Sequence, residues 1–200
     1  MFSLRVPVLS TLGTLLALAA PGCFEPGTGA DLTEPGTQPP NGLFGADGGV
    51  NSTCTDPDPS PLSKLHVVVR TSAFGGRYAP RNVGAIWIET ASGTFVKTLE
   101  KWGSTRSRYI VRWNASSGGN VVDAVTSATL QTHVTHDRTW NLLDKTTCEV
   151  KTGTYRVVVE HTDRDGPGAT IEIPFTKDQT AVTLMPTDAT NFHDMLLELQ

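Results

Sequence analysis

The sequence has little cysteine and lacks the short motifs that mark many enzyme active sites. Its 200 residues include three cysteines, none of them in a Cys-x-x-Cys pair, so neither a dithiol redox centre nor a cysteine-rich zinc site is expected. It also has no Gly-x-Ser-x-Gly sequence and no phosphate-binding loop, which mark α/β-hydrolases and nucleotide-binding proteins. We therefore expect a protein with no metal centre and no catalytic machinery of its own.

An excess of positive charge is also missing. The chain has 16 lysines and arginines against 20 aspartates and glutamates, which gives a formal net charge of −4. Proteins that bind nucleic acid usually concentrate basic residues on one face, where they neutralise phosphates. Nucleic acid is therefore not an expected partner.

The sequence lacks an apolar run of full membrane-spanning length, but it begins with a shorter one. Residues 6–20 are rich in Leu and Ala and follow a short start that carries Arg5. A run of about 15 residues is too short to span a bilayer comfortably and is typical of a signal peptide. We predict that residues 1–22 are a signal peptide and that the protein is exported.

The apolar run ends in the sequence Ala20-Pro21-Gly22-Cys23. Small residues before a cysteine resemble the lipobox of bacterial lipoproteins, and this resemblance implies that Cys23 receives lipid and anchors the chain to a membrane. An ordinary secretory signal that is cut nearby is the alternative. Phe24 stands where an Asp-type retention signal would lie, which favours the outer membrane, with the domain facing the periplasm.

Residues 23–61 are dense in Gly, Pro, Thr, Asp and Asn and contain few large apolar residues. Such a segment buries too little apolar surface to offset the entropy that is lost on ordering, so we predict a disordered tether. Residues 62–200 then form one domain, because about 140 residues is a common size for a single core.

With Cys23 assigned to lipid, Cys54 and Cys148 remain. Export places them in an oxidising compartment, where an even number of remaining cysteines favours one disulfide. Two free thiols are the alternative. The disulfide would close a loop of about 95 residues, for which chain-entropy arithmetic gives an upper figure of about 4–5 kcal/mol.

From residue 62 onward, apolar and polar residues alternate with a period of two, interrupted by Gly, Pro, Asn and Asp. This pattern predicts short strands, at residues 64–71, 83–90, 94–102, 139–143, 154–161, 170–175, 181–185 and 192–199. We expect hairpins between the second and third, the fourth and fifth, and the sixth and seventh. Only residues 104–113 favour a helix. Seven or eight strands at this spacing predict an all-β fold, an immunoglobulin-like β-sandwich.

The order of several segments is similar to that of a known family. These segments are residues 85–89, 93–99, 123–129 and the Trp140 region, and they resemble a bacterial family of predicted periplasmic proteins, the domain of unknown function 2271. The resemblance covers most of residues 62–200 and implies a fold and an extracytoplasmic location, but no activity. Trp140 and the residues up to Tyr155 also resemble the immunoglobulin-like module of the flagellar hook-capping protein.

One segment resembles a modification site. The run Asp123-Ala124-Val125-Thr126-Ser127-Ala128-Thr129 is similar to the acceptor sequence of flavin transferases. The resemblance implies that Thr129 accepts FMN through a phosphoester. Ser127 and Ala128 would leave room for the transferase, which would recognise Asp123. The alternative is a strand followed by a Ser/Thr turn, in which the small residues serve close packing.

The other polar candidates favour structural roles. His133 and His136 are three residues apart, and on a strand this spacing would place them on opposite faces, which argues against a shared metal. His66, His161 and His193 are expected to face solvent or to form hydrogen bonds. Residues 163–166 predict a hairpin tip rather than a calcium loop, because no Glu follows at the required distance. The four tryptophans are expected in the core.

Two functional hypotheses follow. In the first, the domain is a non-catalytic module of the cell envelope that binds a partner protein or carries load. In the second, it is a periplasmic redox carrier whose Thr129 holds covalent FMN and which exchanges electrons with a redox partner.

Overall fold

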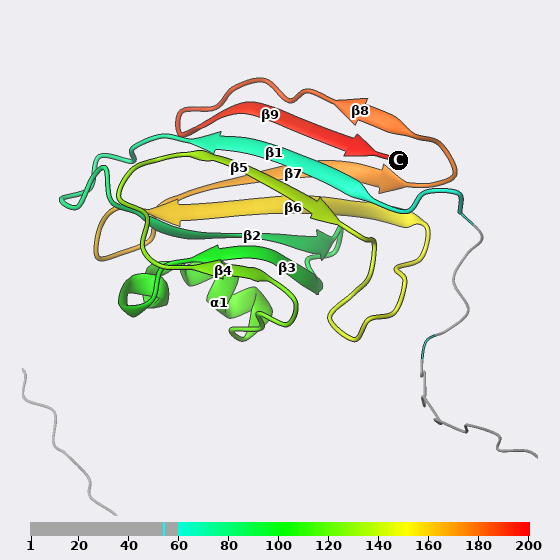
Figure 1. Ribbon diagram of the computed structural model, residues 1–200, viewed down its shortest axis with the longest axis horizontal. Helices are drawn as coiled ribbons and strands as arrows, with labels where there is room; N and C mark the ends of the chain where they lie inside the picture. Colours follow the sequence, from blue (N-terminus) through cyan, green and yellow to red (C-terminus); the bar gives the residue numbers. More distant parts are fainter. Residues whose placement is uncertain (1–53, 55–59) are drawn as a thin grey trace, which may run out of the picture. The chain divides into compact units, whose positions relative to one another are not determined.

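The computed structural model describes residue 54 and residues 60–200. The predicted signal peptide, Cys23 and most of the predicted tether lie outside the described residues, so these assignments stay predictions. The described part contains two β-sheets that pack face to face, with a short helix on the outer face of one of them (Figure 1). This arrangement confirms the predicted all-β sandwich.

The described chain forms nine strands and two short helices. The strands are β1 (Leu65–Thr71), β2 (Val83–Thr90), β3 (Phe95–Trp102), β4 (Val125–Ser127), β5 (Thr135–Trp140), β6 (Gly153–Thr162), β7 (Ala169–Lys177), β8 (Val182–Leu184) and β9 (Phe192–Leu199). Between β3 and β4 lie the 3-10 helix η1 (Thr105–Tyr109) and the helix α1 (Val111–Ser117). The first sheet has the order β5-β1-β9-β8, and the second has the order β4-β3-β2-β6-β7.

Strand β2 shows how the sequence pattern builds the layers. Its side chains alternate between the two faces of the second sheet. Ile86 and Ile88 belong to the main core between the sheets, whereas Ala85 and Trp87 belong to a smaller core that Trp113 of α1 covers. All four tryptophans are buried, at 0–3% exposure, as predicted.

The predicted strand at residues 139–143 is displaced, because β5 begins at Thr135 and ends at Trp140. It pairs with β1 in the first sheet, so the expected hairpin with β6 is wrong. The inward-facing positions of β5 include His136, which is 2% exposed. A buried histidine interrupts the apolar alternation on which the prediction depended.

The expected pair at residues 170–175 and 181–185 is also wrong as a pair. The two strands form, but β7 pairs with β6 in the second sheet and β8 pairs with β9 in the first. Alternation identifies a strand that is buried on one side, but it does not identify the sheet to which the strand belongs. The chain therefore crosses from one sheet to the other between residues 177 and 182.

The hairpin tip at residues 163–166 connects β6 to β7, as predicted. Its first residue, Asp163, is fully buried and accepts hydrogen bonds from the backbone N–H groups of Phe74, Gly75 and Gly76 at 2.7–3.2 Å. A Cβ atom on Gly76 would lie 2.3 Å from Asp163 Oδ1. The carboxylate therefore fixes the loop between β1 and β2 and requires glycine there.

The two ends of the domain are joined. The backbone N–H of Ser63 donates to the carbonyl oxygen of Gln200 at 2.7 Å, and Lys64 and Gln200 also exchange backbone hydrogen bonds. Cys54 and Cys148 form a disulfide with a Cα–Cα distance of 5.3 Å, which confirms the predicted pairing. No helix in the described part of the chain is long and apolar enough to cross a membrane.

Candidate functional site

The predicted flavin-acceptor segment lies at an edge of the second sheet. Its central residues form β4, which runs parallel to β3, with Thr126 opposite Lys101 and Ser127 opposite Trp102. All three residues of β4 are exposed, and so is Ala128. The structure therefore places Thr126, Ser127 and Ala128 on the surface, next to the last residues of β3 (Figure 1).

The start of the segment is held by a buried lysine. Asp123 has a left-handed backbone conformation, with φ 55°, and its exposed carboxylate pairs with Lys97 Nζ at 3.1 Å. The Lys97 side chain is only 6% exposed. Both residues line a groove of about 690 Å³ between the β3–β4 edge and β5. Thr98 adds a hydrogen bond to the carbonyl oxygen of Asn120 at 2.7 Å.

The end of the segment is held by a buried asparagine. Asn82 and Leu130 exchange two backbone hydrogen bonds, of 3.0 and 3.1 Å. The Asn82 side chain is fully buried, accepts a hydrogen bond from Trp102 Nε1 at 2.7 Å, and donates to the carbonyl oxygens of Pro80 and Thr132. On the other side of Thr129, the Ser127 carbonyl oxygen accepts from the backbone N–H of Gly103 at 2.9 Å. Thr129 is thus fixed between two backbone anchors.

Thr129 is partly exposed and lines a depression of about 260 Å³. The other lining residues are Tyr78, Arg81, Thr105, Arg106 and Gln131. Gln131 donates to the carbonyl oxygen of Thr129 at 3.4 Å, whereas the Thr129 hydroxyl has no hydrogen-bond partner among the described residues.

The two arginines of the depression differ in their surroundings. The guanidinium of Arg106 lies 3.9 Å from the centre of the Tyr78 ring and pairs with Asp165 at 3.4 Å. Arg81 is exposed, and within residues 60–200 and at residue 54 no carboxylate pairs with it. The depression is therefore lined by Thr129 and by a positive charge that pairs with no carboxylate of the described residues.

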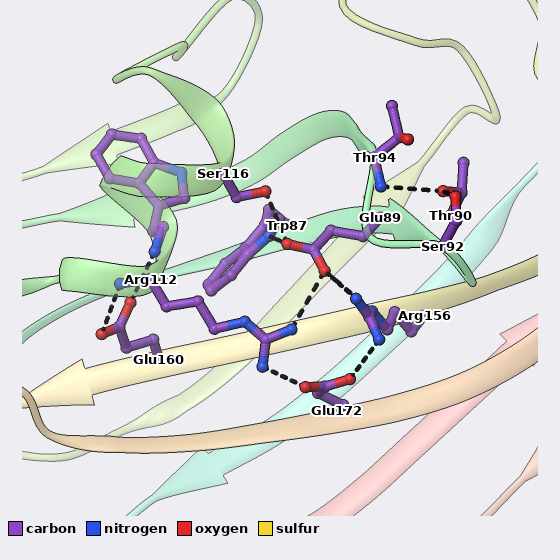
Figure 2. Close-up of polar contacts among 11 residues, drawn as sticks. Trp87, Glu89, Thr90, Ser92, Thr94, Arg112, Ser116, Arg156, Glu160 and Glu172 are labelled. Atoms are coloured by element: carbon purple, nitrogen blue, oxygen red, sulfur yellow. Dashed lines mark hydrogen bonds and ion pairs between the residues drawn. The ribbon is translucent and has the colours of Figure 1, made fainter.

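A cluster of charged residues that the sequence did not reveal lies on the outer face of the second sheet (Figure 2). Glu89 of β2 is 2% exposed. It accepts hydrogen bonds from Trp87 Nε1 at 2.8 Å, Ser116 Oγ at 2.7 Å and Arg156 Nε at 2.9 Å, and it pairs with Arg112 at 3.2 Å. Burial by itself would raise the pKa of Glu89, but these donors outweigh burial and lower it.

Two further glutamates complete this cluster. Glu172 of β7 pairs with Arg112 and Arg156 and so links both guanidinium groups to a second carboxylate. Glu160 of β6 accepts hydrogen bonds from the backbone N–H groups of Trp113, at 2.9 Å, and Arg112, at 3.3 Å (Figure 2). Burial raises the pKa of Glu160, although these backbone donors oppose the shift. The cluster satisfies its own charges and attaches α1 to the sheet, so its arrangement is structural.

The histidines do not form a metal site among the described residues. His66 and His193 make the expected side-chain hydrogen bonds, to Glu198 and Ser72 among others. His161 differs, because it is fully buried, with its ring centre 5.2 Å from that of His133 and 5.3 Å from that of Phe192. Burial and the neighbouring His133 together lower the pKa of His161 to about 4.

His136 is also buried, and its ring stacks on Trp102 with a centroid distance of 4.1 Å. Its Nδ1 lies 2.9 Å from Glu100 Oε2. His133 precedes β5, so strand alternation does not apply to it, and its Nδ1 contacts the Thr71 hydroxyl at 3.0 Å. Each of the two histidines thus has a different partner.

A family model described as "Predicted periplasmic protein (DUF2271)" matches residues 75–191. The match covers more than half of the chain and includes the acceptor segment and every residue of the charged cluster. No curated protein and no solved structure matches the chain significantly.

Proposed function

This chain belongs to the DUF2271 family of predicted periplasmic proteins, and we propose that it is an extracytoplasmic redox carrier with FMN attached to Thr129. The observation that carries this proposal is the placement of Thr129. Thr129 lines a surface depression together with the unpaired Arg81, and its hydroxyl has no partner among the described residues.

The exposure of the acceptor segment supports the proposal. A transferase has to reach the hydroxyl and the recognition residues around it. The Asp123 side chain is 63% exposed, and Thr126, Ser127 and Ala128 are exposed as well. A segment that served only close packing would bury these small residues. The two backbone anchors at Ser127 and Leu130 hold the segment in one conformation that a transferase can recognise.

The attachment needs a donor in which the flavin phosphate is already activated, such as FAD. The Thr129 oxygen forms a bond to the phosphorus of the FMN half, and the pyrophosphate bond of the donor breaks. AMP leaves, and the hydroxyl proton passes to a base of the transferase. The reaction oxidises and reduces nothing, so it needs no further reactant.

The residues around Thr129 fit a phosphoester. The group adds negative charge, and Arg81 and Arg106 supply positive charge at the same depression. When bound, FMN supplies the transfer of one or two electrons at its ring system. The contribution of this chain is to hold the attachment point on a rigid sheet edge, without catalytic machinery of its own.

We further propose that the domain is attached to the outer membrane through lipid on Cys23 and faces the periplasm. This location suits a carrier that exchanges electrons with a redox partner of the envelope. The Cys54–Cys148 disulfide supports the extracytoplasmic part of this proposal, because disulfides persist in oxidising compartments.

The second candidate is a non-catalytic envelope module that binds a protein or carries load. The same disulfide favours it, since a covalent link between the N-terminal segment and the domain resists force. This candidate needs no modification at Thr129. The two functions therefore differ in whether the protein carries covalently attached FMN, which can be measured.

The test is the intact mass of the protein after co-expression with a flavin transferase in an export-competent host. We expect the wild type to gain the mass of one FMN less one water and to give a fluorescent band after denaturation. Thr129→Ala should gain nothing. Thr105→Ala is the matched control, because it removes a hydroxyl from the same depression and should keep the flavin. An unmodified wild type would exclude the carrier and leave the envelope module.

A further inference from the structure

We infer that Arg81 is the positioning residue that neutralises the phosphate of a flavin attached to Thr129. The inference rests on the proposed function and adds to it a residue outside the acceptor segment. Arg81 precedes β2 and is separated from Thr129 by 48 residues in the sequence, so only the fold brings the two together.

A single backbone bridge next to both residues brings Arg81 and Thr129 to the same part of the surface. Asn82 and Leu130 form an antiparallel bridge, which puts Arg81 opposite Gln131 and diagonal to Thr129. Diagonal neighbours in antiparallel pairs are about 7–8 Å apart, within reach of a long side chain. In agreement with this register, the three residues line the same depression.

The charges around the depression single out Arg81 from its basic neighbours. Arg106 and Arg77 both pair with Asp165, at 3.4 and 3.1 Å, and both lie over the Tyr78 ring. The remaining lining residues, Thr105 and Gln131, carry no charge. Arg81 therefore has a positive charge without a counter-charge in the described chain, beside the hydroxyl that would become a phosphodiester.

The expected energetic effect is small, because Arg81 is exposed. Exposed ion pairs stabilise by less than about 1 kcal/mol, which corresponds to at most about a fivefold change in a rate or an equilibrium. The effect should shrink as salt rises, because ions screen exposed charges. Once the flavin is attached, the same pair should restrict its motion by holding the phosphate against the surface.

The test uses the full-length protein, a purified flavin transferase and FAD. We would compare wild type, Arg81→Gln, Arg81→Lys and the control Arg108→Gln. Arg108 lies in η1 and contacts Tyr109, and it does not line the depression. The measurements are the rate of flavin attachment at low and high salt and the fluorescence anisotropy of the attached flavin, with circular dichroism as a check on folding.

We expect Arg81→Gln to slow attachment about threefold to fivefold at low salt and to lower the anisotropy. Arg81→Lys should restore most of the attachment rate and most of the anisotropy, and Arg108→Gln should match the wild type in both measurements. If Arg81→Gln is modified at the wild-type rate and its flavin has wild-type anisotropy, the inference is wrong while the proposed function stands. If no variant and no wild type gains FMN, the proposed function fails and takes the inference with it.

Discussion

Two buried glutamates on one face of the second sheet have opposite pKa shifts, and the difference lies in their hydrogen-bond donors. Both carboxylates lose water, which raises the pKa. Glu89 is surrounded by the indole of Trp87, a hydroxyl and two guanidinium groups, and its pKa is lowered. Glu160 has mainly the backbone N–H groups at the start of α1, and its pKa remains raised. Charged donors stabilise a carboxylate more strongly than neutral amides do, so Glu89 is the glutamate on which the cluster depends.

We expect Glu89→Gln to lower the free energy of unfolding by about 2–3 kcal/mol, because it removes the buried one of the two carboxylates that Arg112 and Arg156 share, while Glu172 still pairs with both. Glu172→Gln is the control. Its side chain is 39% exposed, so the loss should be about 1 kcal/mol or less. Urea denaturation of the two variants measures the difference, and equal losses would contradict the central role of Glu89.

The buried His161 should make the stability of the domain depend on pH in the acid range. Its pKa is about 4 in the folded domain, against 6.5 in the unfolded chain. Between these values the unfolded chain binds more protons, so the free energy of unfolding rises with pH in this window. The contribution of His161 is complete above about pH 6.5 and is lost as the pH falls towards 4, by up to about 3 kcal/mol.

The measurement is urea denaturation of wild type and His161→Leu at several pH values from 4 to 7.5. The free energy of unfolding of the wild type minus that of His161→Leu isolates His161 from the other groups. This difference should fall as the solution is acidified. His66→Gln serves as a control of opposite sign. Hydrogen bonding to Glu198 raises the pKa of His66, so its stabilisation is present below pH 6.5 and is lost as the pH rises above it. Parallel profiles for the two variants would contradict this assignment.

At the scale of elements, the sequence indicated most strands and the hairpin of β2 with β3, but not how the other strands pair. The bounds of β2 and β9 agree with the predicted ranges. The pairing of β5 with β1 and the division of β7 and β8 between two sheets depend on contacts distant in sequence, which a periodic pattern does not encode. A sequence pattern indicates whether a residue is buried or exposed, but it does not identify the strand with which that residue pairs.

The candidate site was predictable in one part only. Residues 123–129 were recognised by their resemblance to an acceptor sequence, and the structure places them at an exposed sheet edge. The neighbourhood of Thr129 was not predictable, because Arg81 reaches it only through the Asn82–Leu130 bridge. The charged cluster around Glu89 was missed for the same reason. Its members come from β2, α1, β6 and β7, and no local spacing connects them.

Asn82 provides a test at this scale. We expect Asn82→Ala to lower the free energy of unfolding by about 2–3 kcal/mol, since it leaves buried Trp102 Nε1 without an acceptor. It should also speed hydrogen exchange at the backbone amide of Leu130, which the Asn82 carbonyl oxygen now protects. The exposed Asn141→Ala is the control. Wild-type exchange at Leu130 in the Asn82 variant would show that the side chain does not hold this segment.

At the scale of the whole molecule, the disulfide should contribute strongly to stability. Cys54 and Cys148 are separated by 94 residues, and a cross-link over such a loop stabilises by up to about 4–5 kcal/mol through the entropy of the unfolded chain. We expect a double change of both cysteines to Ser to lower the free energy of unfolding towards this amount while the fold is kept. Urea denaturation under non-reducing conditions checks it, and an unchanged midpoint would contradict it.

The disulfide and Thr129 lie at opposite ends of strand β2. Thr90, the last residue of β2, lines the same surface depression as Cys54 and Cys148, whereas Arg81 and Asn82 at the start of the strand adjoin Thr129. Eight extended residues span about 27 Å. The sandwich therefore separates Thr129 from the Cys54–Cys148 disulfide, and a molecule that reaches Thr129 approaches from the end opposite to the disulfide.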